Sequence, residues 1–142
     1  MHLIDRNREY VVSLFRMVVG LLFAFHGIDL LFGVITGGRP AVFGHWPGWW
    51  AAVIETVAGG LVLAGLFTRV AAVICSGSMA YAYFTVHQPK TLFPMVNGGE
   101  PAALFCWAFL LLVFIGPGLW SLDALVRRAG ANSSAMDSSL SH

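Results

Sequence analysis

Residues 11–35, VVSLFRMVVGLLFAFHGIDLLFGVI, form an apolar run in which the ionisable residues are Arg16, His26 and Asp29. A helix rises about 1.5 Å per residue, so this run would reach about 37 Å and could cross about 30 Å of hydrocarbon. Ionisable side chains inside such a helix cost free energy unless they find a partner, water or the interface. His26 and Asp29 lie three residues apart and therefore occupy neighbouring positions on one helix face.

The composition of the whole chain is that of an integral membrane protein. Of its 142 residues, 58% are hydrophobic and only 11% are charged, whereas about a quarter of the residues in a soluble domain are charged. The net charge of +1 argues against a nucleic-acid partner, because nucleic-acid binding needs a basic face. The first run is too long for the core of a signal peptide and lacks a small-residue cleavage site, so we expect a retained helix.

Three further apolar runs follow the first, at about 49–67, 70–87 and 101–118. Each approaches or exceeds the length needed to span a bilayer, about 17 to 25 residues. The sequence therefore predicts an all-α fold, a membrane bundle of four transmembrane helices within one domain over residues 1–128. Residues 129–142, AGANSSAMDSSLSH, are rich in Ser and have no apolar pattern, so we expect a disordered tail.

The connections between the runs indicate how the helices are arranged. Residues 36–48 and 88–100 are rich in Gly and Pro and are expected to be loops. Only residues 68–69 join the second and third runs, so those two helices should be antiparallel neighbours. Near the end of the chain, residues 121–129, SLDALVRRA, are expected to form a short amphipathic helix at the membrane surface.

Basic residues near the spans predict the orientation, because cytoplasmic loops carry an excess of Lys and Arg. One side of the expected topology has five such residues and the other has two. The five are Arg6, Arg8, Arg69, Arg127 and Arg128, and the two are Arg39 and Lys90. Both termini and the turn at 68–69 are therefore predicted to lie in the cytoplasm.

This topology gathers polar side chains in the outer half of the bundle. The candidates to bind a ligand or a proton there are His26, Asp29, Glu55, Tyr83, His87 and Glu100. Because isolated buried carboxylates are costly, Asp29 and Glu55 should face inward and share protons with His26 or with each other. We therefore expect a polar pocket that opens outward. Arg16, near the cytoplasmic end, is a candidate for contact with a lipid phosphate or a quinone, since its side chain is long enough to reach the interface.

The same residues include histidines and carboxylates, which are common ligands of metals, and histidine also binds haem iron. His26, Glu55 and His87 could meet, but no ligand pair has the close spacing of a metal motif, so no metal site is predicted. A haem held between the two histidines would need ligands at similar depths, and the expected depths differ by about 10 Å. Cys75 and Cys106 lie in apolar runs without a CxxC spacing and are expected to be buried core residues.

Four segments carry a resemblance to a known family: RMVVGLLFAFHGIDLLFG (16–33), ETVAGGLVLAGLFTRVAA (55–72), NGGEPA (97–102) and GPGLWSLD (116–123). In order and spacing they resemble the DoxX family of small bacterial membrane proteins, over about residues 14–125. The family pattern falls on Arg16, Gly20, Phe23, His26, Gly27, Glu55, Gly59, Gly60, Gly65, Thr68, Arg69, Asn97, Glu100, Gly116, Gly118 and Asp123. Family members usually carry Lys two residues after the His-Gly pair, where this chain has Asp29.

The resemblance implies redox work near the quinone pool of a bacterial inner membrane. Related archaeal proteins are membrane subunits of a thiosulfate:quinone oxidoreductase, and actinobacterial relatives are linked with thiol and oxidative-stress partners. The leading hypothesis is a quinone-linked or thiol-redox membrane subunit in which His26, Glu55 and Asp29 bind or protonate a small ligand. Electron transfer would need a bound cofactor or another subunit, so other membrane or redox proteins are expected as partners.

Two alternatives stay open at this point. The chain could be a structural or assembly subunit without chemistry, or a carrier of a small ligand or of protons. The sequence does not choose between a single copy and a homo-oligomer, and it identifies no catalytic residue.

Overall fold

The computed structural model describes residues 2–130, with side chains from residue 7 onward, and this part of the chain is helical without any strand. The all-α prediction is confirmed. The elements are α1 (His2–Phe32), α2 (Gly48–Ala64), α3 (Thr68–Ala82), the π-helical turn η1 (Tyr83–His87), α4 (Pro94–Asn97) and α5 (Glu100–Ile115). Residues 122–130 are also helical, as expected for 121–129. Residues 129 and 130, the first two of the expected disordered tail, belong to this helix, and the rest of that tail, 131–142, lies outside the described residues.

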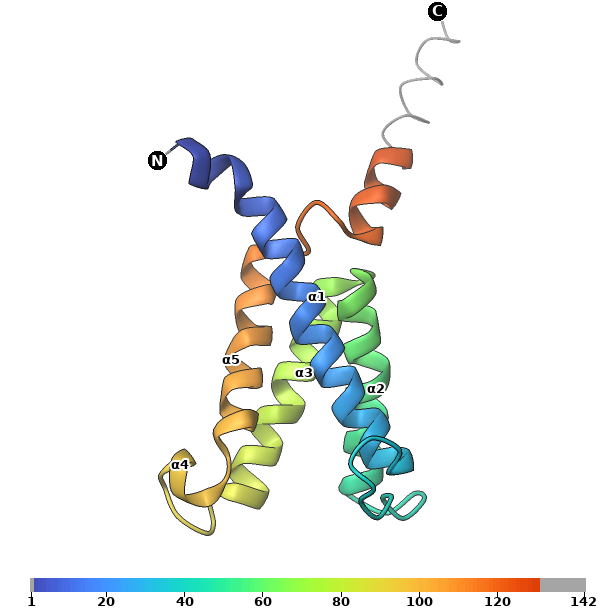
Figure 1. Cartoon of the computed structure of the whole chain (residues 1–142), viewed down its shortest axis with the longest axis vertical. Coiled ribbons are helices and arrows are strands. Elements are labelled where there is room, and N and C mark those ends of the chain that lie inside the picture. The colour runs from blue at the N-terminus through green and yellow to red at the C-terminus, as the bar shows by residue number, and fades with distance from the viewer. Residues whose placement is uncertain (1, 131–142) are drawn as a thin grey trace, which may run out of the picture.

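The four long helices pack along one another (Figure 1). α1 lies along α2, α3 lies along α5, and α2 packs against α3. The first residues of α1, the turn between α2 and α3, and the helical residues 122–130 lie at one end of the molecule. The loops at 33–47 and 88–99 lie at the opposite end. We call these the terminal end and the loop end.

The core lies where the four long helices meet, and aromatic rings fill its centre. Phe23 of α1 contacts Phe109 of α5 with 4.7 Å between ring centroids, and Phe105 with 5.3 Å. Phe23 and Phe109 are fully buried. Smaller buried side chains surround them, namely Val19, Ala58, Val62, Ala71, Ala72, Cys75, Met79, Ala102 and Leu112. Cys75 is therefore a core residue, as predicted, whereas Cys106 is only partly buried and packs against the core.

The contact between α1 and α2 depends on close approach of the two backbones. A Cβ added at Gly20 would lie 2.6 Å from the backbone N of Leu63 and 3.0 Å from the carbonyl O of Gly59. A Cβ added at Gly60 would have nothing within 4 Å. Small residues at helix crossings allow this approach and are common where helices pack in membranes.

The outward faces of the helices are apolar. On α5, Leu104, Trp107, Leu111 and Phe114 are all exposed and recur every three or four residues along one side of the helix. A helix facing water would place polar residues there. Among the described residues, two helical stretches are long and apolar enough to cross a membrane, and α2 and α5 are shorter apolar helices. The two stretches are Asn7–Phe32 and Thr68–His87.

The turn between α2 and α3 lies earlier than predicted. Residues 68–69 were expected to form it, but they begin α3. Gly65 is the physical reason: its φ of 72° is left-handed, and its N–H donates to the carbonyl of Leu61 at 2.9 Å, as does that of Leu66 at 3.0 Å. This is the hydrogen-bond pattern that ends many helices at glycine.

Two other segments also differ from the predicted boundaries. α1 begins at His2, well before residue 11, because the polar first residues continue the helix beyond the apolar run. The expected loop at 88–100 contains α4, which starts at Pro94 and ends at Asn97, before Gly98 with φ 72°. Proline suits the first turn of a helix because its missing N–H has no partner there.

Candidate functional site

A cavity of about 460 Å³ is lined by residues of α1, α2, α3, η1 and α5, together with Gly98 of the loop at 88–99. Its polar lining residues include His26, Glu55 and His87, and the rest of its wall is mainly apolar, with Leu22 and Phe105 among the largest side chains. Three of the six candidates for ligand or proton binding therefore line one cavity, although they come from three separate elements. We call it the His26–Glu55 cavity.

Glu55 and His26 approach each other across α2 and α1. His26 Nε2 lies 3.9 Å from Glu55 Oε2, a distance too long for a hydrogen bond. The side chain of Glu55 is 3% exposed, whereas that of His26 is 61% exposed. Within the described part of the chain, Glu55 Oε2 has no hydrogen-bond partner. Buried polar atoms in proteins are nearly always hydrogen-bonded, so this oxygen calls for a partner that the described residues do not supply.

His87 completes the polar lining from the end of η1. Its Nδ1 lies 3.2 Å from the carbonyl O of Asn97, and this contact occupies one of its two ring nitrogens. Asn97 is itself buried, donates to the carbonyl of Thr91 at 2.7 Å and accepts from the N–H of Gly99 at 2.7 Å. Asn97 therefore positions the loop against which His87 rests. Sequence reasoning noted Asn97 only as part of the family pattern.

Asp29 takes a different role from the one expected. Its Oδ1 accepts from the N–H groups of Ile35 and Thr36 at 2.9 Å each, and its Oδ2 accepts from the Thr36 hydroxyl at 2.6 Å. The chain turns back after α1 and brings these donors over the carboxylate. The side-chain hydrogen bonds of Asp29 are thus with its own turn, and Asp29 does not line the His26–Glu55 cavity.

Tyr83 and Glu100 also lie outside the His26–Glu55 cavity. The Tyr83 hydroxyl donates to the carbonyl of Leu92 at 2.9 Å and so fastens the loop that follows η1. Glu100 begins α5 and lines a neighbouring cavity of about 400 Å³, which shares Pro101 and Phe105 with the first. Both residues therefore lie at the loop end without joining His26 and Glu55.

Arg16 lies at the terminal end and is directed into the protein. Its side chain is 1% exposed. Nε donates to the carbonyl of Pro117 at 2.9 Å, Nη1 donates to those of Val62 and Leu63 at 2.5 Å each, and Nη2 donates to that of Trp120. The last carbonyls of a helix have no partner within the helix, so the end of α2 supplies acceptors for the guanidinium. The expected reach to a lipid phosphate is not seen, because these carbonyls hold the side chain inside.

The DoxX family model matches residues 11–88 of this chain. The chain belongs to the DoxX family. An uncharacterized protein of Haemophilus influenzae is 43% identical over 129 residues, which cover 87% of this chain and 96% of that protein. No solved structure matches the chain. The matched part of this DoxX protein contains all three polar residues of the His26–Glu55 cavity, and membrane association of the family agrees with the apolar outer surface.

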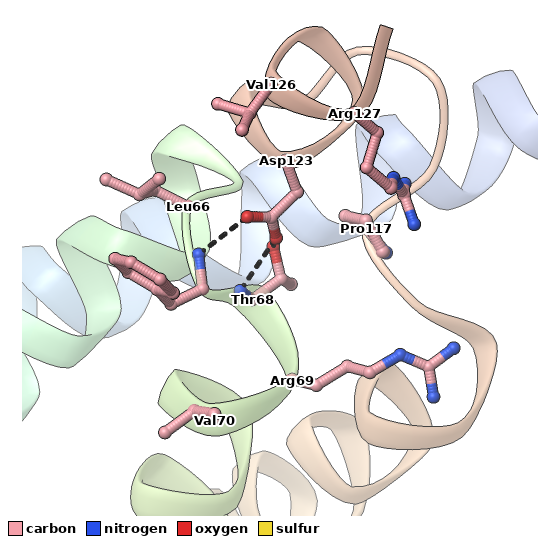
Figure 2. Close-up of a pocket in the computed structure, with 9 residues that line it drawn as sticks. Leu66, Thr68, Arg69, Val70, Pro117, Asp123, Val126 and Arg127 are labelled. Carbon is pink, nitrogen blue, oxygen red and sulfur yellow. Dashed lines mark hydrogen bonds between the residues drawn. The ribbon is translucent and has the colours of Figure 1, made fainter. Parts of the chain in front are cut away.

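Asp123 joins the C-terminal part of this DoxX protein to the start of α3 (Figure 2). Its carboxylate accepts from the N–H of Phe67 at 2.8 Å and from the N–H and hydroxyl of Thr68 at 2.9 and 2.8 Å. Burial acts to raise the pKa of Asp123, but the hydrogen bonds from Thr68 and Phe67 outweigh it and hold that pKa below its ordinary value. Asp123 therefore caps α3, while the hydroxyl of Ser121 accepts from the N–H of Ala124 at 3.1 Å at the start of its own helix.

The low pKa of Asp123 predicts an acid-sensitive contribution to stability. The carboxylate stabilises the fold above its unfolded pKa of about 3.9, and this contribution is lost as the pH falls through the still lower folded pKa. Asp123→Asn keeps one acceptor oxygen but loses the charge and the second acceptor, so it should lower the free energy of unfolding at neutral pH by about 1 kcal/mol, the net value of a typical hydrogen bond. Unfolding in mixed micelles, followed by circular dichroism between pH 3 and 7, would measure the free energy of unfolding of each protein and its dependence on pH. The unfolding free energies of the unmodified protein and of Asp123→Asn should become equal at the acid end of this range. A constant difference between them at every pH would contradict the prediction.

Proposed function

We propose that this DoxX protein spans the bacterial inner membrane with four helices and binds a quinone-type ligand in the His26–Glu55 cavity. The observation that carries the proposal is the carboxylate of Glu55, which is 3% exposed and has an oxygen without a partner among the described residues. A buried polar atom that lines a cavity and has no partner favours a bound molecule with a complementary group.

The lining of the cavity suits the chemistry of a quinone. A quinone ring is flat and apolar, and its two carbonyl oxygens accept hydrogen bonds. Glu55 in its protonated form and His26 can each donate one, while Leu22, Met79 and Phe105 supply apolar contact. The volume of about 460 Å³ falls within the range of about 300–1,000 Å³ that is usual for small-molecule sites.

Glu55 and His26 would also serve as proton donors. Reduction of a quinone to a quinol takes up two electrons and two protons. The carboxyl and the imidazole lie 3.9 Å apart on one side of the cavity and could supply the protons. The electrons would come from a partner redox protein. The thiol branch of the redox hypothesis is less well supported, because Cys75 is 0% exposed and Cys106 is only partly exposed, with its Sγ 3.5 Å from the hydroxyl of Ser76, whereas reactive cysteines are accessible and lie in electropositive surroundings.

The four-span arrangement rests on helix lengths and on charge. α2 has 17 residues and α5 has 16, which corresponds to about 26 and 24 Å. Helices slightly shorter than the hydrocarbon layer are accommodated by local thinning of the bilayer at a modest cost. Arg69, Arg127 and Arg128 lie at the terminal end, so the excess of basic residues favours placing that end in the cytoplasm.

Quinone binding by the purified protein tests this proposal. A short-chain benzoquinone would be titrated into the protein in detergent, with affinity measured by calorimetry. Glu55→Ala and His26→Ala should each weaken binding about tenfold, which corresponds to the loss of one hydrogen bond to a polar ligand. Glu55→Gln keeps a donor and should retain more affinity than Glu55→Ala.

Glu9→Ala is the matched control, because Glu9 is an exposed carboxylate outside the cavity. It should leave the affinity unchanged. Failure of the unmodified protein to bind the quinone, or equal loss in the control, would reject the quinone assignment. If instead the cavity variants bind as before but recover less of a partner complex from membranes, the assembly-subunit alternative gains support.

A further inference from the structure

A second cavity, of about 340 Å³, lies at the terminal end, where the start of α3 meets the segment after α5 (Figure 2). Two arginines line it, Arg69 and Arg127. Three exposed apolar side chains also line it: Phe67, Val70 and Val126. We call this the Arg69–Arg127 pocket. It shares no lining residue with the His26–Glu55 cavity.

The Arg69–Arg127 pocket carries a net positive charge. Among the described residues that line it, Asp123 is the acidic one; its carboxylate accepts hydrogen bonds from Phe67 and Thr68 and also attracts the guanidinium of Arg127, so one positive charge is left in excess. Arg69 Nη1 donates to the carbonyl of Val113 at 2.8 Å. That bond uses one of the five N–H groups of a guanidinium and holds Arg69 beside the pocket.

The geometry of the charged groups suits a phosphate. Figure 2 shows the side chains of Arg69 and Arg127 ending on the same side of the pocket, while Asp123 turns toward the backbone at Thr68. Guanidinium groups bind phosphate through paired hydrogen bonds, and two of them can hold one phosphate from two directions. The sequence suggested Arg16 for contact with a lipid phosphate. In the structure, Arg69 and Arg127 are the arginines placed to make such a contact.

The apolar neighbours of the two arginines indicate where such a phosphate comes from. Phe67, Val70 and Val126 are exposed around a cationic pocket, and a soluble anion would leave them in contact with water. Acyl chains would cover them. The pocket lies at the end proposed to face the cytoplasm, and anionic lipids attract basic residues at that surface.

We propose that the Arg69–Arg127 pocket binds an anionic phospholipid of the cytoplasmic leaflet. Arg69 and Arg127 hold the headgroup phosphate, and Phe67, Val70 and Val126 contact the first part of the acyl chains. An anionic lipid is preferred over a zwitterionic one because the choline of the latter adds a positive charge beside two guanidinium groups. This inference does not depend on which molecule occupies the His26–Glu55 cavity.

Native mass spectrometry of the whole protein in detergent tests the lipid site. Phosphatidylglycerol and phosphatidylcholine with identical acyl chains would be titrated separately. The unmodified protein should bind phosphatidylglycerol more tightly. Arg127→Gln should weaken this binding about fivefold, the effect expected for one basic residue near a lipid headgroup, and adding Arg69→Gln should weaken it further.

Arg128→Gln is the matched control, since Arg128 follows Arg127 in the chain, carries the same charge and lines a different cavity. The affinity of Arg128→Gln for phosphatidylglycerol should stay within about twofold of that of the unmodified protein, because an exposed charge outside the pocket contributes little. Equal losses for Arg127→Gln and Arg128→Gln, or equal binding of the two lipids, would overturn the proposal.

Inorganic phosphate supplies the last arm of the experiment. Phosphate alone should compete with phosphatidylglycerol only weakly, because it lacks the acyl chains. Binding of phosphate as tight as that of the lipid, with the same dependence on Arg127, would instead assign the pocket to a soluble anion and overturn the lipid proposal. Circular dichroism of each variant should match the unmodified protein, because Arg69 and Arg127 are exposed.

Discussion

Replacing Arg16 by alanine is expected to destabilise the folded protein by about 3–5 kcal/mol, the largest effect predicted for any single side chain here. The guanidinium is 1% exposed and donates to four carbonyl groups. Alanine would leave these acceptors without their donor and would open a cavity where the long side chain lies. Both effects act at the point where α1, the end of α2 and the segment after α5 meet.

Unfolding in mixed micelles, followed by circular dichroism, measures this loss. Arg16→Lys separates charge from geometry, because an ammonium keeps the charge but cannot reach acceptors spread around a planar guanidinium; its stability should be intermediate. Arg39→Ala, at an exposed loop position, is the control and should change stability by less than about 0.5 kcal/mol. If Arg16→Ala unfolds at the same denaturant fraction as the unmodified protein, the buried contacts do not stabilise the fold.

Gly20→Ala is expected to force α1 and α2 apart and to cost about 1–3 kcal/mol, the usual range for overpacking a close contact. The added Cβ would lie 2.6 Å from the backbone N of Leu63, and a backbone atom cannot move aside as a side chain can. Relief requires separation of two helices whose contact extends along much of their length. Packing around Phe23, also on α1, should loosen with it.

Gly60→Ala provides the matched control on α2. A Cβ at Gly60 meets nothing within 4 Å, and alanine favours the helix over glycine by up to about 1 kcal/mol. Gly60→Ala should therefore be neutral or stabilising in the same unfolding assay. Equal stability of the two variants would show that the backbones can separate at Gly20 without cost.

Much of the fold follows from the length and spacing of the apolar runs. Four runs of sufficient length, joined by segments rich in Gly and Pro, indicate helices wherever they occur, because apolar side chains must be buried or face lipid. Because successive helices run in opposite directions, the sequence also places the terminal end and the loop end on opposite sides of the molecule. That alternation brought His26 and Glu55 to the same half of the molecule, and the structure places them 3.9 Å apart.

The roles of the other ionisable residues could not be read from the sequence, because they depend on backbone groups. Asp29 is held by N–H groups of a turn whose path depends on where α1 ends. Arg16 meets carbonyls of residues 46 to 104 positions away in the chain. Asp123 reaches Thr68, and no local pattern distinguishes this contact from a cap of its own helix. The sequence shows which side chains are charged. It does not show which unpaired main-chain N–H and C=O groups they meet, because that depends on how the helices are arranged.

The four acceptors around Arg16 are all main-chain oxygens. Mutation of an accepting residue and mutation of the donor Arg16 should therefore affect these hydrogen bonds differently. Every residue type has a carbonyl, so Val62, Leu63 and Trp120 can be exchanged without removing an acceptor. The donor has no such freedom, since no other side chain presents five N–H groups in one plane. During divergence of this protein, the hydrogen bonds themselves should place no limit on residue type at the accepting positions, whereas they retain arginine at position 16.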